Sequence, residues 1–199
     1  TTIWRGNIRF TPATLFSIGF VSLFISGGLT GIFLGNSTID IHLHDTMFIV
    51  AHFHIVMGVA AFFGMFAGIY HWFPKMFGRY LNNTIGYLHF WVTMVGAYLI
   101  FWPMHYQGLA GVPRRYLDKR GWVSFNDFTQ MDKMITIVSI IVFAVQLMFV
   151  FNFIYSIFKG RKVTNKNPWG ANTLEWTTPL RPGHGNWEGE IPEVHRWAY

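Results

Sequence analysis

The chain has 199 residues, of which 52% are hydrophobic, 19% aromatic and only 12% charged, which is too apolar for an ordinary soluble domain. Its formal net charge is +6, but the basic residues flank apolar segments, so the charge indicates membrane topology and not a nucleic-acid partner. Cysteine is absent, which excludes disulfides, thiolate metal sites and cysteine nucleophiles. Any metal must therefore be held by histidine, carboxylate or backbone oxygen.

Four apolar stretches are long enough for a transmembrane helix, which needs roughly 20 residues. They predict membrane spans over residues 12–35, 47–73, 83–105 and 133–158. The sequence therefore predicts an all-α membrane protein, with a transmembrane segment over 1–160 and an irregular tail over 161–199 that is rich in Pro, Gly and Trp. We expect the tail to dock onto neighbouring subunits. The first residue, Thr1, is not methionine, and we expect the chain to be a piece of a longer protein.

Basic residues beside the spans predict the orientation, because Lys and Arg are enriched in loops on the inner side of a membrane. They precede the first span, separate the second from the third and follow the fourth: Arg5, Arg9, Lys75, Arg79, Lys159, Arg161, Lys162 and Lys166. Both ends of the chain and the tail are therefore expected on the inner side. The second outer loop departs from the rule, because Arg114 and Arg115 lie in it and need an anionic partner. Lipid phosphates, Asp118 and Asp127 are candidates, and so is a cofactor with carboxylate arms.

Four histidines lie in the stretch HLHDTMFIVAHFH, residues 42–54, at the start of the second span. Ionisable side chains inside a membrane are costly and usually functional, which applies to His52 and His54. Residues two apart in a helix diverge by about 200°, so these two rings project from nearly opposite faces and cannot easily share one metal. The alternative for each is a packed histidine that is hydrogen-bonded across helices.

Heme suits this pattern better than zinc, because heme iron accepts a single axial imidazole from one helix, whereas a tetrahedral zinc site needs several ligands. The two propionates of heme also supply the anions that Arg114 and Arg115 require. The residues therefore predict two hemes near the outer face, one on each side of the same helix. A membrane ion transporter, with histidines that relay protons or bind a non-heme metal, and a purely structural subunit are the competing classes.

Three motifs, HDTMFIVAHFHIV, HWFPKMFG and GLAGVPRRY, resemble the C-terminal third of subunit I of the heme–copper oxidases. The resemblance runs from about residue 8 to 158, and it implies that the four spans belong to a larger bundle of about twelve helices. It also implies the following ligands and contacts: His52 as the axial ligand of the high-spin heme where oxygen is reduced, His54 as an axial ligand of the low-spin heme, Arg114, Arg115 and Asp40 near the heme propionates, and His44 with Asp45 as a magnesium or manganese site beside subunit II.

The function implied by the resemblance is a terminal respiratory oxidase that passes electrons from cytochrome c through two hemes, of heme a type, to reduce oxygen to water while pumping protons. Copper is implied as well, with its ligands upstream of this segment, which alone should be inactive. The implied partners are oxidase subunits II and III, cytochrome c and the lipid bilayer. Asp45 and Tyr116 favour the cytochrome c branch over a quinol-oxidising enzyme. His42 and Met104 favour a multi-pass protein of the bacterial plasma membrane over the mitochondrial inner membrane.

Several other residues have simpler predicted roles. Asp45 is also a candidate N-cap for the second span, a role compatible with metal binding. His71 is expected to anchor the inner interface, while His89 and His105 are expected either to pack as hydrogen-bonded residues or to contact water. Small residues spaced four apart, Gly27 with Gly31 and Gly64 with Gly68, predict a close approach of neighbouring helices or of a flat macrocycle.

Overall fold

The computed structural model describes residues 3–116, 121–187 and 189–190, and these are almost entirely helical. Within the described ranges there is no β-strand, and the only β-type pairing is two isolated bridges between loops. The elements in chain order are α1 (Pro12–Gly35), α2 (Ser37–Leu43), α3 (Met47–Phe53), the π-helix η1 (His54–Val59), α4 (Ala60–Phe77), α5 (Asn83–Leu109), the 3-10 helix η2 (Val123–Phe128), α6 (Thr129–Lys159) and the 3-10 helix η3 (Leu174–Thr177).

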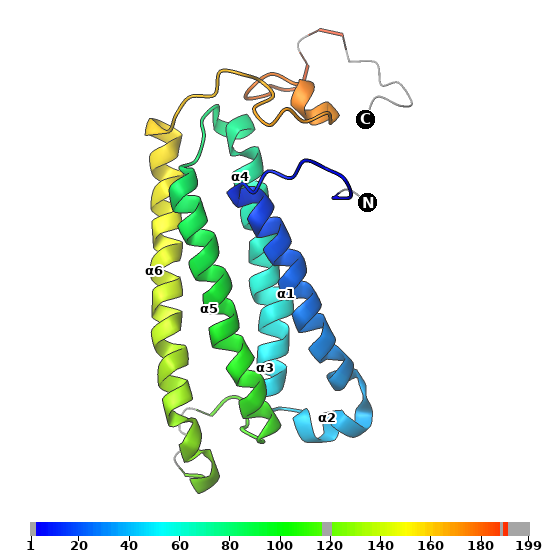
Figure 1. The fold of residues 1–199 in the computed structure, drawn as a ribbon, viewed down its shortest axis with the longest axis vertical. Coiled ribbons are helices and arrows are strands. Elements are labelled where there is room, and N and C mark those ends of the chain that lie inside the picture. The colour runs from blue at the N-terminus through cyan, green and yellow to red at the C-terminus, as the bar shows by residue number, and fades with distance from the viewer. Residues whose placement is uncertain (1–2, 117–120, 188, 191–199) are drawn as a thin grey trace.

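The predicted set of four membrane-spanning helices is confirmed. Four helices are long and apolar enough to cross a bilayer, and α3, η1 and α4 form one of them as a continuous helix over Met47–Phe77. Figure 1 shows the four running side by side in alternating directions, so that the N-terminus and the tail lie at one end of the bundle. We call this the inner end and the opposite one the outer end. The second and third helices continue four residues beyond the predicted ends.

The helices begin where side chains satisfy the free N–H groups of the first turn. The Thr11 hydroxyl accepts from the Thr14 N–H at the start of α1, and the side-chain oxygen Oδ1 of Asn82 accepts from two N–H groups at the start of α5. The α4 helix ends at Phe77 and is followed by Gly78, whose φ of 65° lies in the left-handed region that glycine adopts at little cost. Local sequence therefore sets where the helices begin and end, and with that the position of the functional residues along the bundle.

The helices pack through a core of aromatic side chains. α1 lies against α4, and α5 lies between α3 and α6. The buried rings come from all four spanning helices: Phe16, Phe63, Phe66, Phe90 and Phe149. His89 sits among them, fully buried, and its ring nitrogens bond to the Tyr70 hydroxyl at 3.3 Å and to the side-chain oxygen Oε1 of Gln146 at 3.0 Å. The predicted role of His89 as a hydrogen-bonded packing residue is therefore confirmed.

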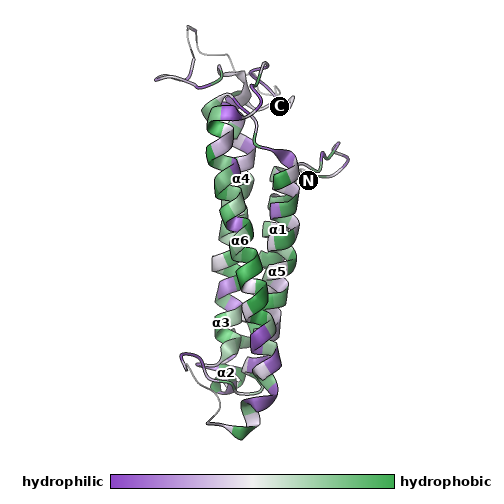
Figure 2. Cartoon of the chain, turned by 90° about the vertical axis from the view of Figure 1, so that its left-hand side faces the viewer, coloured by the Kyte–Doolittle hydropathy of each residue, from purple (hydrophilic) through white to green (hydrophobic). Residues whose placement is uncertain are grey.

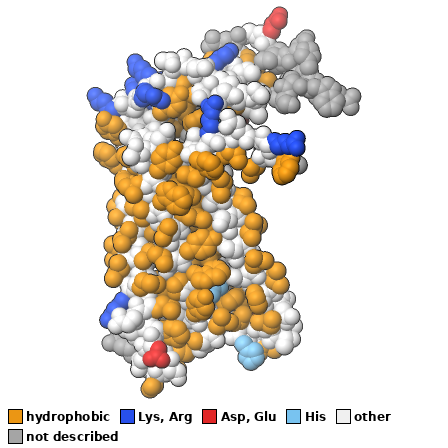
Figure 3. Space-filling view, in the orientation of Figure 1, with side chains coloured by type: hydrophobic (Ala, Val, Ile, Leu, Met, Phe, Trp, Pro, Cys, Tyr) orange, Lys and Arg blue, Asp and Glu red, His pale blue; other side chains and the backbone are white. Residues whose placement is uncertain are grey.

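The outside of the bundle is a broad apolar belt. Figure 2 shows hydrophobic residues along the length of the helices, with hydrophilic ones concentrated near the ends. In the space-filling view the hydrophobic side chains cover the middle of the visible face, and most of the visible Lys and Arg lie toward the inner end (Figure 3). Large apolar side chains such as Ile140 and Phe143 are exposed on α6. This surface suits contact with lipid or with further membrane helices.

The described part of the tail packs against the inner ends of the chain's own helices. The Lys75 ammonium donates to the Thr178 carbonyl oxygen at 2.7 Å, and the Trp169 indole N–H donates to the His71 carbonyl oxygen at 3.0 Å. Trp176 is fully buried beneath this contact. The tail thus covers the end of α4 within the same chain, while its docking onto neighbouring subunits stays a prediction.

Candidate functional site

A π-helix begins at the second histidine of the HFH triplet. His54 is the first residue of η1, which occupies His54–Val59 between α3 and α4. Such wider turns are rare, and inside α-helices they are frequently found at functional sites. The local widening therefore marks the position of the histidine pair.

His52 faces α1. Its Nδ1 lies 2.8 Å from the Gly27 carbonyl oxygen and 2.9 Å from the Thr30 hydroxyl oxygen. Because a carbonyl oxygen can only accept, Nδ1 carries the ring hydrogen, and Nε2 is left as the basic nitrogen. The Thr30 hydroxyl itself donates to the Gly27 carbonyl at 2.6 Å, so both residues of α1 fix the ring.

Gly31 provides the space for the His52 ring. A Cβ at Gly31 would lie 2.8 Å from Cε1 of His52, which is closer than side chains tolerate. A Cβ at Gly27 would lie 2.8 Å from a methyl carbon of Ile55. The close approach that the Gly27 and Gly31 spacing predicted is therefore confirmed, and it brings α1 directly against the histidine-bearing segment.

His54 faces α5 instead. Its Nδ1 donates to the Val50 carbonyl oxygen at 2.7 Å, and its ring stacks on Phe101 with centroids 5.2 Å apart and planes 13° apart. The predicted divergence of the two rings is confirmed, because His52 contacts α1 and His54 contacts α5. Nε2 of neither ring has a hydrogen-bond partner among the described residues. A ring N–H held by a backbone carbonyl, with the other nitrogen available, is the arrangement that metal-ligating histidines use.

The two outer loops meet above the histidines. The Met47 N–H donates to the Val112 carbonyl at 2.9 Å, the Arg114 N–H donates to the Asp45 carbonyl at 2.9 Å, and Thr46 and Pro113 form an antiparallel bridge. These contacts place the HDT segment directly beside the PRR segment.

Arg114 has a protein partner in Asp45. Its guanidinium forms an ion pair with the Asp45 carboxylate, an anion that was not among the predicted partners of the loop. The predicted capping role of Asp45 is wrong, because the Thr46 hydroxyl accepts from the Phe48 N–H and is the N-cap of α3. Asp45 has a φ of 58° and lies one residue before the N-cap Thr46, with its side chain turned to Arg114. Asp118, another expected partner, lies outside the described residues.

Arg115 lines a cavity at the outer end, between α3, α5 and α6. The cavity has a volume of about 580 Å³, and Met47 and Val50 line it from α3. Because the Val50 carbonyl holds His54, this cavity, which we call the Arg115 cavity, lies on the His54 side of α3, one turn toward the outer end. A basic side chain over a cavity next to an available imidazole suits a ligand with carboxylate groups.

Asp40 and His44 form a pair on and just after α2. Nδ1 of His44 lies 3.2 Å from an Asp40 carboxylate oxygen, and the His44 side chain is mostly exposed. His44 and Asp45 therefore engage different partners. Within the described ranges, no group of three or more His, Cys, Asp or Glu side chains is gathered as a metal site.

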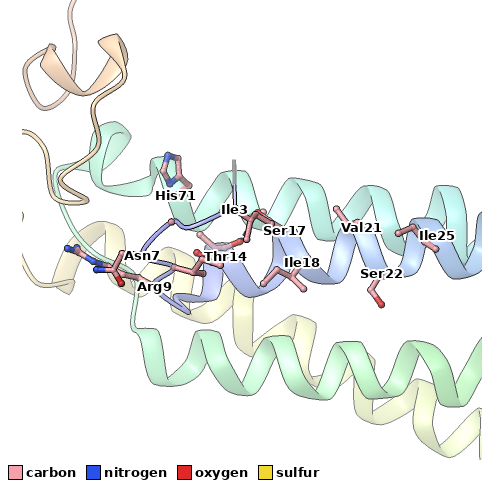
Figure 4. A pocket seen from close by; sticks show the side chains of 14 residues that line it. Ile3, Asn7, Arg9, Thr14, Ser17, Ile18, Val21, Ser22, Ile25 and His71 are labelled. Carbon is pink, nitrogen blue, oxygen red and sulfur yellow. Dashed lines mark hydrogen bonds between the residues drawn. The ribbon is translucent and has the colours of Figure 1, made fainter. Parts of the chain in front are cut away.

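A second cavity, of about 670 Å³, lies at the inner end (Figure 4). It runs along α1 from Arg9 past Ser17 to Ile25, with His71 on α4 at its side. The residues predicted to bind cofactors are not among those that line it. This cavity is therefore separate from the site around His52 and His54.

Three residues that contribute to the site were missed by the sequence analysis. Thr30 was given no role although it binds His52, and Gln107 and Asp132 were overlooked although they line the Arg115 cavity. Polar residues within apolar spans were the available signal, since Thr30 and Gln107 are both buried in membrane helices. Their partners lie far away in the chain, so spacing alone did not connect them.

Comparison with known proteins agrees with the motifs. Residues 1–141 match the family model for cytochrome c and quinol oxidase polypeptide I. The whole chain is 52% identical to the alternative cytochrome c oxidase subunit 1 of Bradyrhizobium diazoefficiens and 45% identical to cytochrome c oxidase subunit 1 of Thermostichus vulcanus, covering 34% and 35% of those proteins. The chain is also 44% identical to cytochrome c oxidase subunit 1 of Alkalihalophilus pseudofirmus, in a match that covers 97% of this chain and 30% of that protein.

The chain belongs to the cytochrome c and quinol oxidase polypeptide I family, which confirms the expected relation to subunit I of the heme–copper oxidases. It spans about a third of the length of the curated relatives that it matches. Membership of this family supports an oxidase subunit and sets aside the ion-transporter interpretation.

Proposed function

We propose that this chain is part of the catalytic subunit of a terminal respiratory oxidase, which transfers electrons from cytochrome c to oxygen and couples the reaction to proton pumping. Oxygen takes up these electrons together with protons and becomes water. The observation that carries the proposal is the pair of imidazoles on one helix, each with Nδ1–H bonded to a backbone carbonyl and Nε2 available. The two rings lie against different helices, which suits two separate hemes.

In this proposal His52 holds the high-spin heme at the oxygen-reducing centre and His54 is one ligand of the low-spin heme, both of heme a type. Bound heme iron would supply the redox chemistry, with copper held by residues outside this chain. The chain's own part is to orient the ligands. Gly27 and Thr30 fix the His52 ring, and the Val50 carbonyl fixes the His54 ring, which sets the basicity of each Nε2.

Arg114, Arg115 and Asp40 belong to the propionate region in the proposal. The support is that Arg115 lines the cavity on the His54 side and that the Nε atom of Arg114 is buried without a partner among the described residues. A donor in that state is costly unless a ligand or water accepts from it. A heme propionate is an acceptor of the required charge.

His44 and Asp45 stay a proposed magnesium or manganese site, shared with subunit II. One imidazole and one carboxylate fill only part of the octahedral shell that these ions prefer, so the remaining ligands would come from water and from the other subunit. Asp45 would have to bind the ion while it is paired with Arg114. Manganese accepts nitrogen ligands more readily than magnesium does, which favours manganese here.

Cytochrome c is the proposed electron donor, because the three relatives described above are named as cytochrome c oxidase subunits. These relatives come from bacteria, which favours a bacterial plasma membrane over a mitochondrial inner membrane. Subunits II and III are the proposed partners, and further membrane helices would cover part of the apolar belt. A quinol donor would instead be indicated if the complete enzyme oxidised a quinol and not reduced cytochrome c.

The test uses the complete oxidase with His52→Ala in this segment. Loss of the axial imidazole should remove the carbon monoxide difference spectrum of the high-spin heme while the low-spin band persists. His42→Ala, at an exposed position on α2, is the matched control and should keep the spectrum. An intact carbon monoxide spectrum in His52→Ala would refute the assignment.

A further inference from the structure

The Arg115 cavity contains a polar pair that the proposed function does not use. Gln107 of α5 and Asp132 of α6 both line it, and the Gln107 amide N–H donates to an Asp132 carboxylate oxygen at 2.7 Å. Gln107 is fully buried. A buried amide inside a membrane helix is expensive unless its donor and its acceptor are both satisfied.

Only one half of the Gln107 amide is satisfied by the described residues. Its nitrogen donates to Asp132, but its oxygen, Oε1, is buried with no hydrogen-bond partner there. Because Asp132 fixes the nitrogen, the orientation of the oxygen is fixed as well. The site therefore calls for a hydrogen-bond donor beside Oε1.

The loop before the two arginines folds back onto the backbone of Gln107. The Val112 N–H donates to the Gln107 carbonyl oxygen at 3.0 Å, which folds the loop back over the end of α5. Arg115 follows with a φ of 69°, in the left-handed region, and its side chain lines the same cavity as Gln107 and Asp132. A guanidinium carries more N–H donors than one carboxylate can use, so Arg115 has donors left for a second acceptor.

We infer that Gln107 and Asp132 position the Arg115 guanidinium for a carboxylate ligand in the Arg115 cavity. Gln107 Oε1 accepts from Arg115, and Asp132 holds the Gln107 amide and supplies a counter-charge to the guanidinium. The remaining face of the guanidinium is then directed toward the ligand. This inference rests on the proposed function, in which the ligand is a propionate of the low-spin heme carried by His54.

The test is a redox titration of the low-spin heme in the complete oxidase, followed through its optical band. Arg115→Gln removes a positive charge, so it should lower the midpoint potential. Gln107→Leu changes no charge, yet it should also lower the potential, by no more than Arg115→Gln does, because the guanidinium loses its anchor. The double variant should have the same midpoint potential as Arg115→Gln alone. Gln130→Leu, at an exposed position of α6, is the matched control and should leave the potential unchanged.

An unmoved potential in Gln107→Leu would overturn the inference. So would a double variant whose shift in potential equals the sum of the two single shifts. Asp132→Asn provides a second variant if Gln107→Leu does not assemble, since asparagine can still accept from Gln107 while its negative charge is gone. It should raise the potential, and an unmoved or lowered potential would overturn the inference as well. If instead His54→Met leaves the low-spin band unaltered, the proposed function fails, which separates the two outcomes.

Discussion

Replacing Gly31 with alanine tests the packing that orients His52. The added Cβ would lie 2.8 Å from Cε1 of His52, about 0.6 Å short of the 3.4 Å at which ordinary contact begins. The ring is held by contacts of 2.8 and 2.9 Å at Nδ1, so it cannot move away without stretching them. Overpacking of this kind costs about 1–3 kcal/mol. Alanine recovers up to about 1 kcal/mol of helix propensity, which leaves a net loss of up to about 2 kcal/mol.

A loss of this size lowers the equilibrium constant for the native arrangement of the ring by up to roughly 30-fold. In the complete oxidase Gly31→Ala should therefore diminish or shift the carbon monoxide difference spectrum, while the low-spin band serves as an internal reference. Gly28→Ala is the matched control, because nothing lies within 4 Å of a Cβ there. If both variants keep the wild-type spectrum and the same heat-denaturation midpoint, the reasoning about Gly31 is refuted.

Three further changes address other parts of the site and the fold. His54→Met should shift the optical band of the low-spin heme, and a band at the wild-type position would remove that ligand role. Thr30→Val takes an acceptor away from the His52 Nδ1–H, which makes the imidazole less basic, so a redox titration should find the high-spin heme potential raised; a lowered potential would contradict this. Trp176→Ala empties a fully buried position and should cost about 3–5 kcal/mol, seen as a fall in the heat-denaturation midpoint. Trp4→Ala, at an exposed position, should leave that midpoint unchanged. If both variants changed the midpoint equally, the result would count against the tail contact.

The arrangement of the spans and the direction of the two histidines could be predicted from the sequence, because both depend on local periodicity. Apolar length gave four spanning helices, and the turn per residue separated His52 from His54. The motifs also led to the correct family. These features need no knowledge of which distant residues meet.

The partners of the site residues could not be predicted, because they come from distant parts of the chain. Arg114 pairs with Asp45, which lies on the preceding outer loop, and this contact left Thr46 to cap α3. The π-helix at His54 has no simple signal in the residue pattern. The pairing of Gln107 with Asp132 depends on how α5 and α6 are turned toward each other, which only the folded chain defines.

The most direct measurement is an experimental structure of the complete oxidase with its cofactors bound. The account predicts that Nε2 of His52 and Nε2 of His54 each coordinate the iron of a different heme, with both Nδ1 atoms still bonded to backbone carbonyls. A structure in which both rings approach one ion, or in which either Nε2 points to protein instead of iron, would contradict it.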